Sequence, residues 1–129
     1  MERLIFDESH EMFRASARRF FEAEIGPHSA RWREQGFVDR VAFRKAGEAG
    51  LLLLWADAKY GGAGIEDFRY EQIIIEENAR YGDQCFFATL HSRLVGPYLG
   101  KLGNEEQKAR LLPGAISGER ILGIAMTEP

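Results

Sequence analysis

The sequence predicts an all-α domain, a bundle of five to six helices over residues 1–118, followed by one short strand within residues 119–129. Two observations favour the bundle: apolar residues recur at helical spacing in successive segments, and Gly or Pro separates those segments by short turns. A third favours the strand, because the apolar run from Ile121 to Met126 is short and follows a turn. One strand cannot make a sheet, so we expect its hydrogen-bonding partners to come from outside these residues.

The first helix is expected to begin after Asp7, whose carboxylate can accept hydrogen bonds from the free amides of the first turn. Glu8 and Glu11 lie in that turn, where the helix dipole favours negative charge. One face then forms an apolar stripe, made of Phe13, Ala17, Phe20, Phe21 and Ile25. The opposite face, which carries Arg14, Arg18, Arg19 and Glu22, is expected to be solvated.

Gly26 and Pro27 are expected to end this helix, and Pro27 can open a second short segment that Trp32 anchors and Gly36 ends. Asp39 is the expected N-cap of the next helix. Small residues in that helix would let a neighbour approach closely around Phe43, and they are Ala42, Ala46, Gly47 and Ala49.

After the apolar run Leu51–Trp55, the glycines of residues 57–64 indicate a turn cluster. A phosphate-cradling loop is not favoured there, because no Lys-Ser or Lys-Thr follows the glycines. Residues 67–81 predict an amphipathic helix with Tyr70, Ile73, Ile74 and Tyr81 on its apolar face. Glu76 and Glu77 are adjacent, so they face different directions and favour salt bridges over acid–base catalysis.

The segment from Cys85 to Leu102 is apolar on all sides of a helical wheel, which predicts a central helix buried on most sides and bent at Gly96-Pro97. Its few polar residues could line an acyl-chain pocket or be satisfied polar groups of the core, and they are Thr89, His91, Ser92 and Arg93. The spacing of Asn104 and Gln107 predicts a capping box for a last helix, ending at Pro113, with a loop over residues 114–118.

The bulk composition excludes several classes of function. With a formal net charge of −3 and scattered basic residues, nucleic acid is not an expected partner. The apolar runs are too short to span a membrane, and no secretory leader is apparent. Cys85 is the single cysteine, so a reducing compartment and a buried thiol are expected. No metal site is predicted, because His28 lacks a second ligand at metal spacing.

Several stretches, in order, resemble the acyl-CoA dehydrogenase family, and together they cover essentially all 129 positions. Residues 124–129, Ile-Ala-Met-Thr-Glu-Pro, resemble the first half of its flavin-binding signature. Gly50-Leu51-Leu52 with Tyr60-Gly61-Gly62 is similar to a family loop, although Asp57 stands where proline is usual. Three further stretches resemble the long-chain branch, namely Leu90-His91-Ser92, Leu94-Val95 and residues 103–108.

The resemblance implies a chain that forms the N-terminal helical domain of an FAD-dependent enzyme plus the first strand of a middle β domain. The implied reaction is α,β-dehydrogenation of medium- to long-chain acyl-CoA thioesters in fatty-acid β-oxidation, with electrons passed to an electron-transfer flavoprotein. The family's glutamate base would lie beyond residue 129, so no catalytic residue is assigned and the isolated chain is expected to be inactive. The implied location is bacterial cytoplasm or mitochondrial matrix.

The same resemblance assigns site residues. The flavin edge would be contacted by Ile124, Ala125, Met126 and Thr127, where hydrogen-bond donors favour charge on the reduced ring. The acyl pocket would include Phe86, Phe87, Leu90, His91 and Leu94. A homo-oligomer is expected, and exposed apolar faces predict self-association of the isolated chain. Two alternatives stay open: a stand-alone helical interaction module, and part of an acyl-CoA oxidase.

Overall fold

The computed structural model describes residues 5–81 and 85–128, and their helical architecture confirms the predicted all-α fold class. Six α-helices lie in these residues: α1 (Glu8–Phe20), α2 (Ser29–Gln35), α3 (Arg40–Glu48), α4 (Phe68–Ala79), α5 (Gly96–Leu102) and α6 (Glu105–Ile116). Two short π-helices, η1 (Phe21–Ile25) and η4 (Leu90–Val95), extend α1 and precede α5, and 3-10 turns η2 (Gly26–His28) and η3 (Ala58–Tyr60) complete the set.

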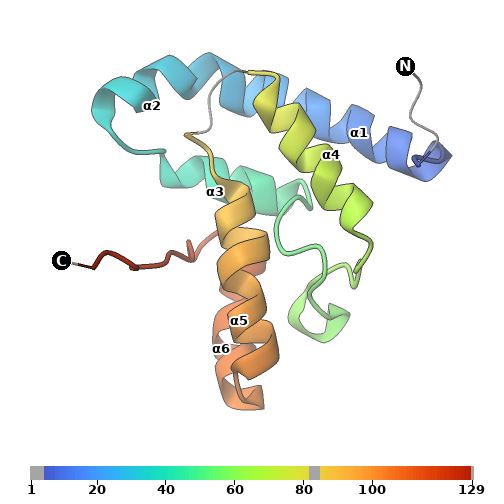
Figure 1. The fold of residues 1–129 in the computed structure, drawn as a ribbon, viewed down its shortest axis with the longest axis vertical. Helices are drawn as coiled ribbons and strands as arrows, with labels where there is room; N and C mark the ends of the chain where they lie inside the picture. Colours follow the sequence, from blue (N-terminus) through green and yellow to red (C-terminus); the bar gives the residue numbers. More distant parts are fainter. Residues whose placement is uncertain (1–4, 82–84, 129) are drawn as a thin grey trace.

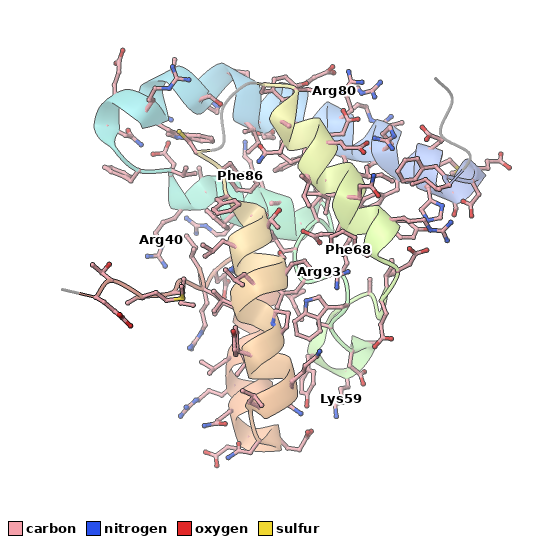
Figure 2. The ribbon with its side chains drawn as sticks, in the orientation of Figure 1. Arg40, Lys59, Phe68, Arg80, Phe86 and Arg93 are labelled. Carbon is pink, nitrogen blue, oxygen red and sulfur yellow. The ribbon has the colours of Figure 1, made fainter. Side chains whose placement is uncertain are left out.

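The helices form two packed pairs. Helix α4 lies along α1, and α5 runs beside α6 as a second pair that projects from the first (Figure 1). Helix α3 lies at the junction of the pairs, and Phe86 reaches the same junction from the residues just before η4 (Figure 2). The junction is therefore where the core forms.

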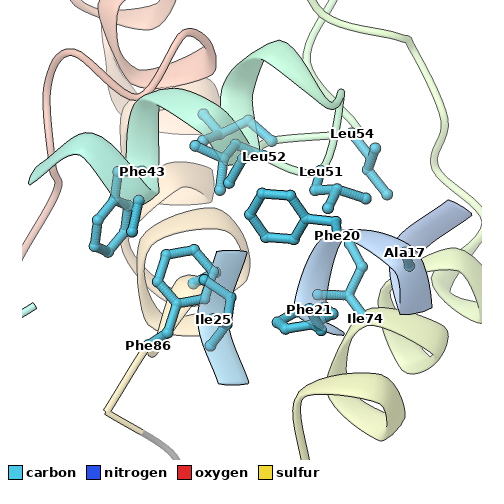
Figure 3. Close-up of a cluster of buried hydrophobic side chains, with 14 of the residues drawn as sticks. Ala17, Phe20, Phe21, Ile25, Phe43, Leu51, Leu52, Leu54, Ile74 and Phe86 are labelled. Atoms are coloured by element: carbon cyan, nitrogen blue, oxygen red, sulfur yellow. The ribbon is translucent and has the colours of Figure 1, made fainter. Parts of the chain in front are cut away.

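Aromatic rings from distant segments meet in that core. The ring centroids of Phe43 and Phe86 are 4.9 Å apart, and Phe20 and Phe21 contact Phe86 at 6.3 and 6.2 Å (Figure 3). Residues 51–54, the apolar run after α3, are buried against them. Offset and tilted aromatic pairs of this kind contribute about 0.5–1.5 kcal/mol each beyond their buried area. The core thus joins α1, η1, α3 and the residues just before η4.

The capping signals at Asp7, Asn104 and Gly36 are confirmed. The Asp7 carboxylate accepts a hydrogen bond from the His10 amide at 3.1 Å, and the Asn104 side chain accepts one from Gln107 at 2.8 Å. Helix α2 ends at Gly36 with φ of +83°, a left-handed conformation that favours glycine. Asp39 holds the N-cap position of α3, but its carboxylate binds Arg31 and Gln35 instead of capping the helix.

The predicted end of the last helix at Pro113 is wrong, as is the loop predicted over residues 114–118. Pro113 lies inside α6, which continues to Ile116. A proline removes one amide donor but has a helical φ, so the turn can continue when later amides find acceptors. The Ser117 amide does so by donating to the Pro113 carbonyl at 3.0 Å, and Gly118 then leaves the helix with φ of +75°.

The expectation of a fully solvated charged face on α1 is also wrong. Arg14 is mostly covered, and its guanidinium donates to Glu76 at 2.7 Å. The carboxylate of Glu77 is fully buried and accepts from Arg18 at 2.9 Å and lies 3.2 Å from Arg80. The preference for salt bridging at Glu76 and Glu77 is therefore confirmed, and these ion pairs join α1 to α4.

The segment expected to be buried on most sides is instead open on one face. Leu94, Tyr98 and Leu102 are 47, 58 and 78% exposed. The bend predicted at Gly96-Pro97 stays a prediction, and the helix changes there from the π-helix η4 to the α-helix α5. Pro97 crowds the preceding turn and donates no amide hydrogen, and a wider π turn relieves that crowding.

Residues 121–128 leave the bundle as an extended tail (Figure 1). The described part of the chain contains no strand, and a single strand without a partner has no ladder to form. The strand therefore stays a prediction about the chain with partners, and Pro129, at which it was expected to end, lies outside the described residues.

Candidate functional site

The five residues assigned to an acyl pocket separate into two environments. Phe86 and His91 are buried in the interior, each about 1% exposed. Phe87 and Leu94 are exposed and Leu90 is half-buried. Only the second group can contact an apolar ligand without rearrangement of the core.

The exposed apolar residues of η4 and α5 form a shallow groove of about 420 Å³. Its lining consists of Arg93, Leu94, Pro97, Tyr98, Lys101 and Leu102. We call these six residues the η4–α5 face. Four of its lining residues are Leu94, Pro97, Tyr98 and Leu102, and the other two are the cations Arg93 and Lys101. Such a surface can bury an alkyl chain once a second surface covers it.

The opposite side of the same helix is held tightly against the loop after α3. Trp55 donates from Nε1 to the Ser92 carbonyl at 2.7 Å, and the Leu53 amide donates to the Ser92 hydroxyl at 3.1 Å. A Cβ on Gly100 would lie 2.5 Å from the Trp55 ring, so glycine allows this close approach. These contacts orient the η4–α5 face outward. The glycines at 96 and 100, one helical turn apart, were the signal in the sequence, and our sequence reasoning did not use it.

A buried pair of ionisable side chains at the edge of the face was not predicted. Glu71 of α4 is not one of the residues of the predicted apolar face of its helix, yet it is about 1% exposed. Its Oε2 lies 3.5 Å from Nε of Arg93, whose guanidinium also lies 5.3 Å from the centre of the Phe68 ring (Figure 2). Burial raises the pKa of Glu71 to about 7, against the opposing pull of the Arg93 charge.

His91 connects three parts of the chain. Its Nε2 lies 2.9 Å from the Ala115 carbonyl at the end of α6, and its Nδ1 accepts a hydrogen bond from the Leu122 amide at 3.0 Å. The ring also packs edge-on against Phe43, with centroids 5.8 Å apart. Burial lowers the pKa of His91, so the ring is neutral near pH 7.

The residues assigned to a flavin edge follow directly after Leu122. Ile124, Ala125, Met126 and Thr127 are all exposed, and Met126 is more exposed than Ile124. Their backbone and the Thr127 hydroxyl are therefore accessible to a ligand. They form one edge of a site, and the other walls would have to come from another surface.

Two classes of site find no support in the described residues. Within residues 5–81 and 85–128, no group of three or more His, Cys, Asp or Glu side chains could hold a metal ion. Over the same residues, no helix is long and apolar enough to cross a membrane. The candidate site is thus the η4–α5 face together with the tail that His91 holds beside η4.

The fold and the site together define a helical-bundle domain with one exposed apolar helix face and an extended, exposed tail. The sequence matches the profile of the acyl-CoA dehydrogenase N-terminal domain over residues 7–119. This chain therefore belongs to the acyl-CoA dehydrogenase family, as its N-terminal domain.

Relatives of known sequence agree with this assignment. The chain is 40% identical over 127 residues to the mitochondrial long-chain specific acyl-CoA dehydrogenase of Sus scrofa, a match that covers 98% of this chain and 29% of that protein. It is 32% identical to a probable acyl-CoA dehydrogenase of Bacillus subtilis, covering 96% of this chain and 21% of the relative. The chain thus spans under a third of the length of the relatives it matches.

Solved structures share the fold. An acyl-CoA dehydrogenase from Geobacillus kaustophilus superposes with a TM-score of 0.92 at 42% identity, over 99% of this chain and 33% of that one. A glutaryl-CoA dehydrogenase from Mycobacterium smegmatis in complex with FADH2 gives a TM-score of 0.79 at 23% identity, over 90% of this chain and 30% of its own. The second likeness supports the fold alone.

Proposed function

We propose that this chain is the acyl-chain side of an FAD-dependent acyl-CoA dehydrogenase that oxidises medium- to long-chain thioesters in fatty-acid β-oxidation. The observation that carries the proposal is the η4–α5 face, an outward apolar surface whose helix is tied through His91 to the tail with the flavin-edge residues. A hydrophobic surface and a flavin edge on neighbouring segments suit a substrate with an alkyl chain and a carbon–carbon bond to be oxidised.

Each part has a separate role in this proposal. Leu94 and Leu90 of η4, with Phe87 just before it, would contact the alkyl chain and exclude water from it. The accessible backbone and hydroxyl of Thr127, with Ala125 and Met126, would hold the edge of the flavin ring. FAD, when bound, would accept the hydride. The general base, the remaining flavin contacts and the docking site for an electron-transfer flavoprotein would lie on the rest of the protein, which we propose is a homo-oligomer of the bacterial cytoplasm or mitochondrial matrix.

The first test is to read the native transcript beyond the codon for Pro129 and to assay the protein it encodes. We expect a continuing reading frame and a purified flavoprotein that oxidises acyl-CoA with an artificial electron acceptor. A stop codon directly after Pro129 would favour the stand-alone interaction module instead. Rapid reoxidation of the reduced enzyme by oxygen would favour an acyl-CoA oxidase.

Leu94→Asp in that full protein is expected to raise KM for long-chain substrates by roughly ten- to a hundredfold, because it removes about 1.5–3 kcal/mol of apolar burial. The effect on a four-carbon substrate should be much smaller, since a short chain would not reach as far along the groove. The measurement is the ratio of the two KM values.

Val41→Asp is the matched control, because Val41 is 45% exposed but lies on α3, away from the η4–α5 face. It should leave the chain-length preference unchanged. Equal effects of the two substitutions, or no effect of Leu94→Asp, would count against an acyl chain on this face.

The 129 residues alone are expected to show no acyl-CoA dehydrogenation when supplied with FAD and an artificial acceptor. The reason is chemical: the residues assigned here contact the flavin and the alkyl chain, and none is placed to remove the α proton. Any substrate-dependent reduction of the acceptor by the purified chain would contradict this.

A further inference from the structure

The His91 ring has a single arrangement of its proton. The Leu122 amide can only donate, so the Nδ1 that faces it at 3.0 Å is an acceptor without a proton. The Ala115 carbonyl can only accept, so the Nε2 that faces it at 2.9 Å carries the hydrogen. Both ring nitrogens are thereby used by backbone groups, and neither is available for chemistry on a substrate.

The two hydrogen bonds of His91 hold different parts of the chain to η4. The bond from Nε2 joins η4 to the end of α6, within the helical bundle. The bond to Nδ1 joins η4 to Leu122, two residues before Ile124. Upstream of Leu122, the Arg120 amide donates to the Gly114 carbonyl at 2.9 Å, which closes the turn after α6. Beyond that turn, the Leu122 bond ties the start of the tail to η4, while the Leu122 side chain also packs against the core.

We infer that His91 is a positioning residue that holds the flavin-edge segment, residues 123–127, at a set place beside the helix that carries the acyl-chain face. It acts through Leu122 and touches neither ligand. For the flavin, this inference rests on the proposed function; the anchoring of the tail by His91 does not.

Two substitutions separate the bonds. In His91→Asn the side-chain amide oxygen can take the place of Nδ1 and accept from Leu122, but it cannot reach Ala115. In His91→Gln the longer amide can take the place of Nε2 and donate to Ala115, but it offers nothing in the place of Nδ1. Both variants lose a similar amount of ring packing against Phe43, so comparing one with the other removes the general effect on stability.

The first readout is amide hydrogen exchange and backbone NMR of the 129-residue chain itself. His91→Gln should speed exchange of the Leu122 amide by roughly five- to twentyfold relative to His91→Asn, in line with the loss of one hydrogen bond. Amides of residues 123–128 should show faster motion in the same variant. Equal exchange at Leu122 in the two variants would overturn the anchoring role.

The second readout is the flavin affinity of the full protein, measured by absorbance on titration with FAD. We expect His91→Gln to weaken flavin binding about tenfold relative to His91→Asn, with a smaller change in KM for acyl-CoA. If the tail is released in the first experiment but flavin affinity is the same in both variants, the flavin assignment of residues 124–127 is wrong while the anchor stands. If the Leu122 amide exchanges at the same rate in the two variants, His91 does not anchor the tail and the inference itself fails.

Discussion

Gly118→Ala is expected to lower the free energy of unfolding by about 3–5 kcal/mol, a large share of the stability of a small domain. Gly118 has φ of +75°, which disfavours any residue with a Cβ. A Cβ there would also lie 2.0 Å from the carbonyl oxygen of Phe43 and 2.8 Å from the Arg44 amide. Both contacts are with the backbone of α3, so no rotamer change relieves them, and α3 would have to separate from the end of α6.

The matched control is Gly36→Ala. Gly36 has φ of +83°, and a Cβ there would meet nothing within 4 Å. Gly36→Ala should lower the free energy of unfolding only by the cost of a left-handed backbone for a residue with a Cβ, about 1–2 kcal/mol. The measurement is urea unfolding of both variants, followed by circular dichroism. Similar midpoints for the two would show that the close approach of α3 to Gly118 contributes little.

What the sequence predicted well was decided by residues a few positions apart. The N-cap at Asp7, the capping box at Asn104 and the glycine stop at Gly36 each depend on bonds within one helical turn, so the pattern contains the partners. The apolar stripe of α1 was likewise confirmed, with Ala17 to Ile25 in the core. These local signals were enough to predict that the helices exist and that the fold is all-α.

The wrong predictions concern residues whose contact partners are distant in the sequence. Arg14 is polar, and periodicity assigns such a residue to solvent; its burial depends on α1 meeting α4, where its partner Glu77 lies 63 positions away. Glu71 was missed for the same reason, since Arg93 lies on a different helix. The helical wheel of residues 85–102 is apolar on all sides, which predicted that α5 is buried. The face with Tyr98 is instead exposed, because none of the described residues covers it.

The candidate site could be predicted only as a set of residues. The resemblance named nine positions, and the structure distributed them among core, face and tail: Phe86 packs with Phe43, Leu94 lies outside, and Thr127 is in the open tail. A sequence pattern gives helical phase but not which side a second helix will cover. The link from His91 to Leu122 spans 31 positions and depends on the turn after α6, which was itself mispredicted.

Glu71→Gln is expected to stabilise the protein at pH 8, by an amount that decreases as the pH falls. The pKa of Glu71 is about 7 in the folded chain, raised from 4.5 by burial. Between these values the folded state binds more protons than the unfolded state, so stability is full below pH 4.5 and is lost as the pH rises through 7. Each pKa unit corresponds to about 1.4 kcal/mol, so the ionised carboxylate costs up to about 3 kcal/mol at pH 8.

Glutamine keeps the shape of the side chain and stays neutral, so its advantage over Glu71 should be about 2–3 kcal/mol at pH 8 and near zero at pH 4.5. Urea unfolding of the variant and the parent at several pH values measures the difference between their free energies of unfolding. The pH dependence that comes from all other groups is the same in both proteins and cancels in this difference. Glu34→Gln, at an exposed position of α2, is the control and should change stability by less than about 0.5 kcal/mol at each pH.

The opposite result would assign a different role to the pair. If Glu71→Gln were less stable than the parent at pH 8, Glu71 would be ionised there, and its attraction to Arg93 at 3.5 Å would exceed the penalty of burial. The geometry argues against that outcome, because neither oxygen of Glu71 accepts a hydrogen bond and the Nε of Arg93 donates none. A buried ion pair needs such bonds to offset its desolvation, so the neutral acid is the form that this site favours.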